Sequence, residues 1–201
     1  MKYFFKFISF IFHPMFLPVL GLFLIFSTGG HHVYTPLPIR KIIYITVFVT
    51  SCILPLSVVP LLFLMKKVNS VYMRTRQERI WPMFITGFFF MTGYYFLYNI
   101  TAVPDLILKF ILATIITVFL SLLITLFWKI SIHLVGMGGL TGAVLALSYI
   151  AGADRHILVS VLFILAGLLG VARVYLQEHK PAQVYAGFAL GFAVVFTYVM
   201  F

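Results

Sequence analysis

Three arginines gather in a short polar segment between two long apolar runs. Arg74, Arg76 and Arg79 lie within six residues, and Pro82 follows at a position that suits the first turn of a helix. A guanidinium binds phosphate oxygens through two parallel N–H groups, so the segment is typical of a phosphate clamp. A loop that is basic because it stays on the cytoplasmic side of a membrane has the same composition, and both interpretations stay open.

A second polar segment contains a histidine beside a cation and a hydroxyl. Lys129, Ser131 and His133 stand directly before a glycine-rich apolar run, so His133 lies near the amino end of a predicted helix. The helix dipole there favours the neutral imidazole, and the free backbone N–H groups are ready donors to an anion. These features suit phosphate chemistry, although an interfacial histidine with satisfied bonds would look the same.

A third segment combines an arginine, a histidine and a residue able to orient that histidine. His179 follows Arg173, and Gln183 comes four residues later, across the first turn of a helix that Pro181 is suited to begin. In phosphoryl transfer, His179 would attack phosphorus, Arg173 would hold the equatorial oxygens, and His133 would protonate the leaving oxygen. The three segments together therefore predict a phosphate site.

The elements that must position these residues are apolar. Of 201 residues, 63% are hydrophobic and 9% are charged, whereas about a quarter of a soluble domain is charged. This composition excludes a soluble enzyme, a disordered protein and a coiled coil. A net charge of +10 would suggest nucleic acid as the partner of a soluble protein. Here the lipid bilayer is the nearer partner, and no nucleic acid is expected.

Seven apolar runs are candidates for membrane-spanning helices. We expect an all-α fold, a polytopic transmembrane helical bundle of about six or seven spans, in a single integral membrane domain over residues 1–201. The first run is interpreted as a retained helix and not as a signal peptide, because His13, Pro14 and Pro18 interrupt it. The third, fifth and sixth runs are short, and we expect them to be tilted or partly re-entrant. The runs are roughly 7–26, 42–65, 83–98, 106–128, 134–150, 157–172 and 182–201.

Glycines recur at helical spacing in the fifth and seventh runs. Gly187 and Gly191 form a GxxxG pair, and Gly136, Gly139 and Gly142 follow one another at intervals of three. Both patterns predict close packing of helices. For the second pattern, a flexible wall beside a ligand is an alternative.

Alternate crossings place the three polar segments on one side of the membrane, called here the basic face. Ten lysines and arginines fall on it and three on the other side, which would put the basic face in the cytoplasm. Five of the ten are proposed ligands, however, and the remaining five against three favour the cytoplasm only slightly. The ten cations of the basic face are Lys2, Lys6, Lys66, Lys67, Arg74, Arg76, Arg79, Lys129, Arg173 and Lys180.

The third segment, in particular, resembles a motif of the type 2 phosphatidic acid phosphatases, of the acid phosphatase and vanadium haloperoxidase superfamily. That motif is Ser-Arg, five residues, His, three residues, Asp. Residues 172–183 match it, with Ala172 in place of serine and Gln183 in place of aspartate.

The other two segments resemble the remaining motifs of this family less fully. The second motif, Pro-Ser-Gly-His, is matched at Ser131 and His133 only. The first motif, Lys, six residues, Arg-Pro, keeps a cation at Arg74 and the proline at Pro82. The likeness covers about residues 70–195 and is that of a divergent, small, membrane-embedded branch. Bacterial members usually face outward, against the charge count.

The resemblance implies roles by position. His179 would form a phosphohistidine and His133 would be the general acid. The reaction would be metal-independent hydrolysis of a membrane lipid phosphate or diphosphate, of the phosphatidic acid, phosphatidylglycerol phosphate or polyprenyl diphosphate type, in a bacterial inner membrane. No cofactor is implied, and the one cysteine and four acidic residues offer no cluster of metal ligands. The phosphate would be held by Arg173, Arg79, Arg74, Arg76, Lys129 and Ser131, with Gln183 orienting His179.

Gln183 is the departure that matters most. An amide oxygen can fix the tautomer of His179, but it supplies no negative charge to a positive ring. Glu78 or Glu178 would have to compensate. We therefore expect slow turnover, a specialised substrate, or a protein that binds or transports an anionic phospholipid without hydrolysing it. If the basic loops only contact headgroups, then His133, Arg173 and His179 should not converge.

Overall fold

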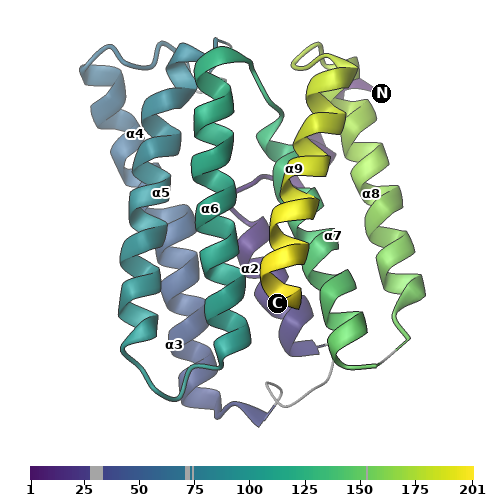
Figure 1. Cartoon of the computed structure of the whole chain (residues 1–201). Coiled ribbons are helices and arrows are strands. Elements are labelled where there is room, and N and C mark those ends of the chain that lie inside the picture. The colour runs from purple at the N-terminus through teal and green to yellow at the C-terminus, as the bar shows by residue number, and fades with distance from the viewer. Residues whose placement is uncertain (28–33, 71–72, 74, 153) are drawn as a thin grey trace.

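The computed structural model describes residues 1–27, 34–70, 73, 75–152 and 154–201. Within these residues the regular structure is helical throughout, so the predicted all-α fold is confirmed, and the long helices form one bundle (Figure 1). The elements are α1 (Lys2–Ile11), α2 (Leu17–Ser27), α3 (Leu37–Phe48), the π-helix η2 (Val49–Ile53), α4 (Leu54–Leu64), α5 (Gln77–Tyr98), α6 (Asp105–Phe127), α7 (Ile132–Ile150), α8 (His156–Tyr175) and α9 (Pro181–Met200).

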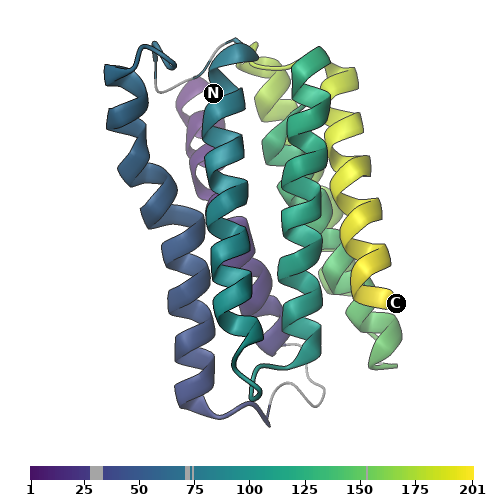
Figure 2. The same ribbon diagram turned by 60° about the vertical axis from the view of Figure 1, so that its left-hand side comes forward.

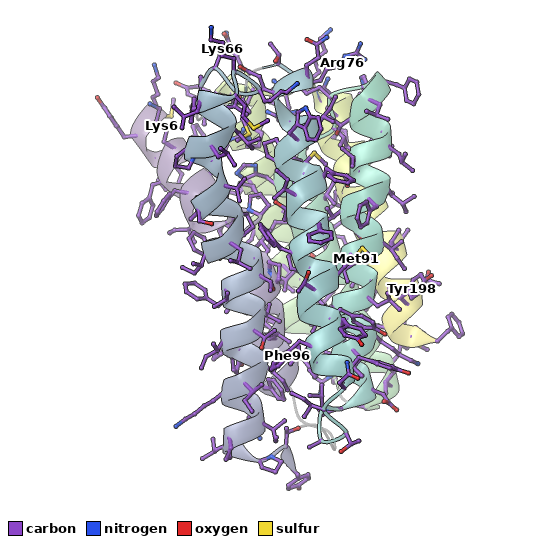
Figure 3. All side chains as sticks on the ribbon, turned by 90° about the vertical axis from the view of Figure 1, so that its left-hand side faces the viewer. Lys6, Lys66, Arg76, Met91, Phe96 and Tyr198 are labelled. Atoms are coloured by element: carbon purple, nitrogen blue, oxygen red, sulfur yellow. The ribbon has the colours of Figure 1, made fainter. Side chains whose placement is uncertain are left out.

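Six helical stretches in the described part of the chain are long and apolar enough to cross a bilayer, with mean hydropathy from 1.3 to 2.7. They are α5 to α9 and the continuous stretch Leu37–Leu64 that joins α3, η2 and α4. Large apolar side chains such as Met91, Phe96 and Tyr198 point outward from the bundle (Figure 3), at 50%, 53% and 42% exposure. An apolar exterior of this kind fits an integral membrane protein surrounded by lipid.

The first apolar run is not one continuous helix. The chain leaves the helix at residues 12–16, and α2 resumes at Leu17. Pro14 has no N–H to donate, and it disfavours helical geometry at His13, so the expected single helix is broken there. α1 packs against α8 and α2 against α7. A side chain of η2 contacts the backbone at this break, because the Cys52 thiol donates to the carbonyl of Met15 at 3.1 Å.

The runs expected to be short are full-length helices. α5 has 22 residues, α7 has 19 and α8 has 20. The apolar runs underestimated their lengths because polar residues lie in the terminal turns of the helices, with Glu78 and Arg79 in α5, His133 in α7, and His156 and Arg173 in α8. A re-entrant path is therefore not needed for any of them.

Glycines bring α7 and α9 into the closest packing of the bundle. A side chain on Gly191 would overlap the carbonyl oxygen of Val135, and one on Gly187 would stand 2.7 Å from that of Ser131. Because only glycine allows this approach, the amino ends of the two helices meet. The backbone N–H of Ser131 donates to the carbonyl of Gln183 at 3.2 Å, which joins the second and third polar segments directly.

The loops of the three polar segments lie at one end of the bundle, with the amino terminus. Figures 1 and 2 show the α4–α5, α6–α7 and α8–α9 connections together at the top. Figure 3 shows Lys6, Lys66 and Arg76 at this same end. The basic face is thus a real surface of the fold.

Candidate functional site

A tight turn at the end of α8 places His179 beside Arg173. The N–H of Glu178 donates to the carbonyl of Arg173 at 3.1 Å, and that of Gln177 to Val174 at 2.9 Å. This is the Schellman pattern of a helix carboxyl end, with Gln177 in the left-handed region at φ 56°. The N–H of His179 reaches the same Arg173 carbonyl at 3.3 Å. The turn therefore folds the five intervening residues back and brings the two functional residues together.

Gln183 fixes the tautomer of His179. Its Oε1 accepts the backbone N–H of Lys180 at 3.1 Å, as the third residue of a helix commonly does for the capping residue. The same oxygen lies 3.1 Å from Nδ1 of His179. Because that oxygen is an acceptor, Nδ1 carries the proton, and Nε2 keeps its lone pair. A neutral histidine with an unprotonated Nε2 is the form needed for nucleophilic attack.

Arg79 faces this lone pair from α5. Its Nη1 lies 3.4 Å from Nε2 of His179, and its Nε donates to the carbonyl of Met73 at 2.9 Å. Arg173 contributes a second guanidinium, whose Nη2 is 3.8 Å from Oε2 of Glu178. The Nε of Arg173 is buried without a hydrogen-bond partner. We call Arg79, Arg173, His179 and Gln183 the His179 cluster, and all four are at most 9% exposed.

Burial and positive charge keep His179 neutral. Burial, followed by the charges of Arg79 and Arg173, lowers the pKa of His179 to about 3, against the smaller opposing effect of the Gln183 bond. Burial also lowers the pKa of Lys129, which lies half-buried near the same arginines. Two buried guanidiniums close to a neutral imidazole, only partly balanced by Glu178, form a site with an excess of positive charge, and such a site favours an anion.

The lowered pKa of His179 makes a testable contribution to stability. In the unfolded chain His179 takes up a proton below about pH 6.5, whereas in the folded protein it does so only near pH 3. As the pH is lowered below 6.5, the free energy of unfolding should therefore decrease, by about 1.4 kcal/mol per pH unit from this group. Between pH 7 and pH 5 the wild type should lose about 2 kcal/mol more than His179→Gln, measured by unfolding in detergent. Equal losses in both proteins would contradict the assignment.

His133 in the first turn of α7 reaches the region of the two arginines, and Ser131 caps the same helix. His133 lines the same cavity as Arg79 and Arg173. Its Nε2 lies 3.2 Å from the carbonyl of Ser9 and donates to it, so Nδ1 is the nitrogen left to exchange a proton with a ligand. The hydroxyl of Ser131 is fully buried without a hydrogen-bond partner. The second polar segment therefore adds a histidine to the cavity, whereas Ser131 does not line it.

Two of the predicted arginines are not placed at this site: Arg76 lies apart from it, and Arg74 is not among the described residues. Arg76 is exposed, and its Nη1 donates to the carbonyls of Leu126 and Phe127 at 2.9 and 2.7 Å. It thereby ties the start of α5 to the end of α6 and is not part of the His179 cluster. Arg74 lies outside the residues that the structure describes.

The two acidic residues of the basic face are engaged elsewhere than with the His179 ring. Glu78 accepts the backbone N–H groups of Asn69 and Thr75 at 3.0 and 3.1 Å, which shapes the loop before α5. Glu178 pairs with Arg173. Neither carboxylate therefore supplies the negative charge that Gln183 cannot give to the His179 ring, because Glu178 balances part of the charge of Arg173 instead.

His13 is a candidate that the sequence did not single out. It lies in the break between α1 and α2, lines the cavity, and stands edge-on to His133 with ring centroids 5.3 Å apart. Its Nδ1 is 3.4 Å from the backbone N–H of Met15, which leaves the proton on Nε2. An ionisable residue inside an apolar run was the available signal.

Comparisons of the chain with models of known protein families, with curated proteins and with solved structures found no match. The likeness to the phosphatases therefore stays a prediction from three motifs. Among the described residues, no three His, Cys, Asp or Glu side chains are grouped as metal ligands would be.

Proposed function

We propose that this chain is a membrane lipid phosphatase that hydrolyses a lipid phosphate or diphosphate through a phosphohistidine on His179, without a metal ion. The observation that carries the proposal is the orientation of His179. Oε1 of Gln183 accepts the proton on Nδ1, and the lone pair of Nε2 faces Nη1 of Arg79 at 3.4 Å. A buried imidazole held in this way, beside a second arginine with a free N–H, suits attack on a phosphate.

The first step transfers the phosphoryl group to the protein. Nε2 of His179 forms a bond to phosphorus while the bond from phosphorus to the lipid oxygen breaks. Arg79 and Arg173 bind the other phosphoryl oxygens, where negative charge must be held. Once the phosphate is bound, its negative charge stabilises a proton on Nδ1 of His133, and this proton passes to the leaving lipid oxygen while the Ser9 carbonyl keeps the Nε2–H in place.

The second step releases inorganic phosphate. His133, now neutral, accepts a proton from water at Nδ1 as the water oxygen attacks the phosphohistidine. The bond between phosphorus and Nε2 breaks, and the electron pair returns to His179.

A panel of lipid phosphates tests the proposal directly. Purified protein should release phosphate from at least one of phosphatidic acid, phosphatidylglycerol phosphate and a polyprenyl diphosphate, in the presence of a chelator. A trapped phosphoprotein that is stable to base and labile to acid would identify the phosphohistidine. If no member of a broad panel releases phosphate, the proposal that this protein is an enzyme is overturned.

Changing Gln183 to aspartate should move the pH dependence of turnover. In the wild type the pKa of His179 is lowered to about 3, so this residue should cause no loss of rate as pH falls to about 4. A carboxylate at Nδ1 stabilises the protonated ring, so Gln183→Asp should raise that pKa and move an acidic limb toward neutral pH. The matched control is Gln77→Asp, which adds the same charge at an exposed position on α5. An unchanged profile in Gln183→Asp would contradict the contact.

Binding without turnover is the second candidate function. It is favoured by Gln183, which gives no charge to the ring, and by Arg79, which faces the nucleophilic nitrogen. In that case the protein would bind or move an anionic phospholipid through the same arginines. The panel separates the two functions: saturable binding that depends on Arg79 and Arg173, with no phosphate released, supports this candidate.

A further inference from the structure

A cavity of about 320 Å³ begins at Arg79 and Arg173 of the His179 cluster and extends into the apolar interior. Arg79, Arg173 and His133 line it at the basic face, and Phe90 and Phe110 line it at depth. Along α5, Phe90 is eleven residues beyond Arg79, a distance of about 16 Å at 1.5 Å per residue. The hydrocarbon core of a bilayer is about 30 Å thick, so the cavity reaches about halfway across.

The walls of the cavity change character with depth. Cationic side chains stand at its mouth, whereas Phe90, Phe110 and Val195 are buried, apolar and at the far end. The occupant that complements both parts is an amphipathic anion, with its charge at the arginines and a hydrocarbon chain below.

We propose that the cavity holds one hydrocarbon chain of the lipid phosphate and measures its length. This inference rests on the proposed function, because Arg79 and Arg173 must hold the phosphate for the chain to enter. A water molecule occupies about 30 Å³, so the cavity has room for about ten groups of methylene size. A second chain does not fit, and in a two-chain lipid it stays in the surrounding bilayer.

Ser121 supplies an independent sign of a ligand in this space. It lines the cavity from α6, is 1% exposed, and its hydroxyl has no partner among the described residues. A buried hydroxyl without a partner is costly, and a lipid ester carbonyl just below the phosphate would satisfy it. Ser121→Ala should therefore weaken the binding of an acyl ester more than that of an alkyl phosphate.

Thr114 offers a substitution that shortens the cavity. It is half-buried, lines the cavity one helical turn nearer the basic face than Phe110, and its hydroxyl donates to the Phe110 carbonyl at 2.9 Å. Thr114→Phe should remove about 5 Å of depth, the length of about four methylene groups. The matched control is Thr92→Phe on the exposed face of α5, where the hydroxyl makes the same kind of bond, to Phe88 at 3.1 Å.

The experiment uses the full chain in phosphatidylcholine nanodiscs and a dodecyl phosphonate with a diazirine at its tenth carbon. The phosphonate is not hydrolysed, so labelling reports on binding alone. We expect adducts near Phe90 and Thr114, at least fivefold less labelling in Thr114→Phe, and a change of less than twofold in Thr92→Phe. Val118→Phe, which fills the cavity one turn nearer its mouth, repeats the test if Thr114→Phe does not fold. Labelling of outward-facing residues, or labelling that neither filling variant reduces, would overturn the proposal.

A series of alkyl phosphates from six to sixteen carbons links the cavity to turnover. Release should rise up to about ten to twelve carbons in the wild type, and the optimum should fall by about four carbons in Thr114→Phe. If no alkyl phosphate is hydrolysed while labelling behaves as expected, the cavity binds a hydrocarbon chain but the proposed phosphatase activity is overturned. If Thr114→Phe slows all chain lengths equally, the phosphatase stands and the chain site is overturned.

Discussion

Replacement of His179 by alanine should reduce phosphate release by about 10⁴-fold or more, as the loss of a nucleophile typically does. The physical reason is that Nε2 of His179 carries the lone pair that faces Arg79, and alanine has no atom that can bond to phosphorus. The phosphoprotein should disappear along with turnover. Lipid binding should persist, because both guanidiniums remain. Initial rates on the most active lipid phosphate, together with acid-labile phosphate on the protein, measure the effect.

His156→Ala is the matched control for that change. His156 begins α8 at the opposite end of the bundle, with its side chain 85% exposed beside Asp154. Its removal should leave the rate within about twofold of wild type. Turnover by His179→Ala at more than a few per cent of the wild-type rate would show that another group is the nucleophile, even if the protein is a phosphatase.

Arg79 and Arg76 should differ sharply, although they lie three residues apart. Arg79→Gln should lower kcat/KM by about 10²- to 10³-fold, as the loss of one buried group that stabilises the transition state commonly does. Arg79 is 7% exposed and faces His179, whereas Arg76 is exposed and donates to the carboxyl end of α6. Arg76→Gln should therefore change kcat/KM by less than about threefold. Both values come from the same lipid panel at fixed ionic strength.

The comparison keeps the change of charge the same in both variants. If the arginines act only by making the basic face attractive to anionic lipid, the two variants should lose activity equally. Adding salt should then remove the difference between each variant and the wild type. Equal losses would contradict a specific role for Arg79. Arg79→Lys adds a further check, because a lysine keeps the charge but loses the planar fork, so only partial recovery is expected.

The membrane-spanning architecture could be predicted from local composition. Long apolar runs and scarce charge are sufficient to place helices, because a bilayer accepts few other structures. The ends of those helices could not be predicted equally well. α5 begins at Gln77 in a polar segment, and the first run breaks at Pro14, since hydropathy averages over a window and does not register where one N–H is missing.

The grouping of Arg173, His179 and Gln183 was also predictable in outline. Residues four apart on a helix are neighbours, so the bond between His179 and Gln183 follows from their spacing. The turn that brings His179 back to Arg173 could not be predicted from the sequence, because Gln177 adopts the left-handed conformation there, where glycine is the usual residue.

By itself, the sequence determined the helical membrane fold, the shared face of the three polar segments, and the pairing of His179 with Gln183. Helical periodicity, apolar length and the parity of crossings are all local properties. Only the tertiary structure decided that Arg79 and not Arg76 faces His179, that His133 is bonded to Ser9, and that a cavity opens below the cluster. These outcomes depend on how close α7 and α9 approach and on which carbonyl each donor reaches. Such distances are set by packing between residues far apart in the chain.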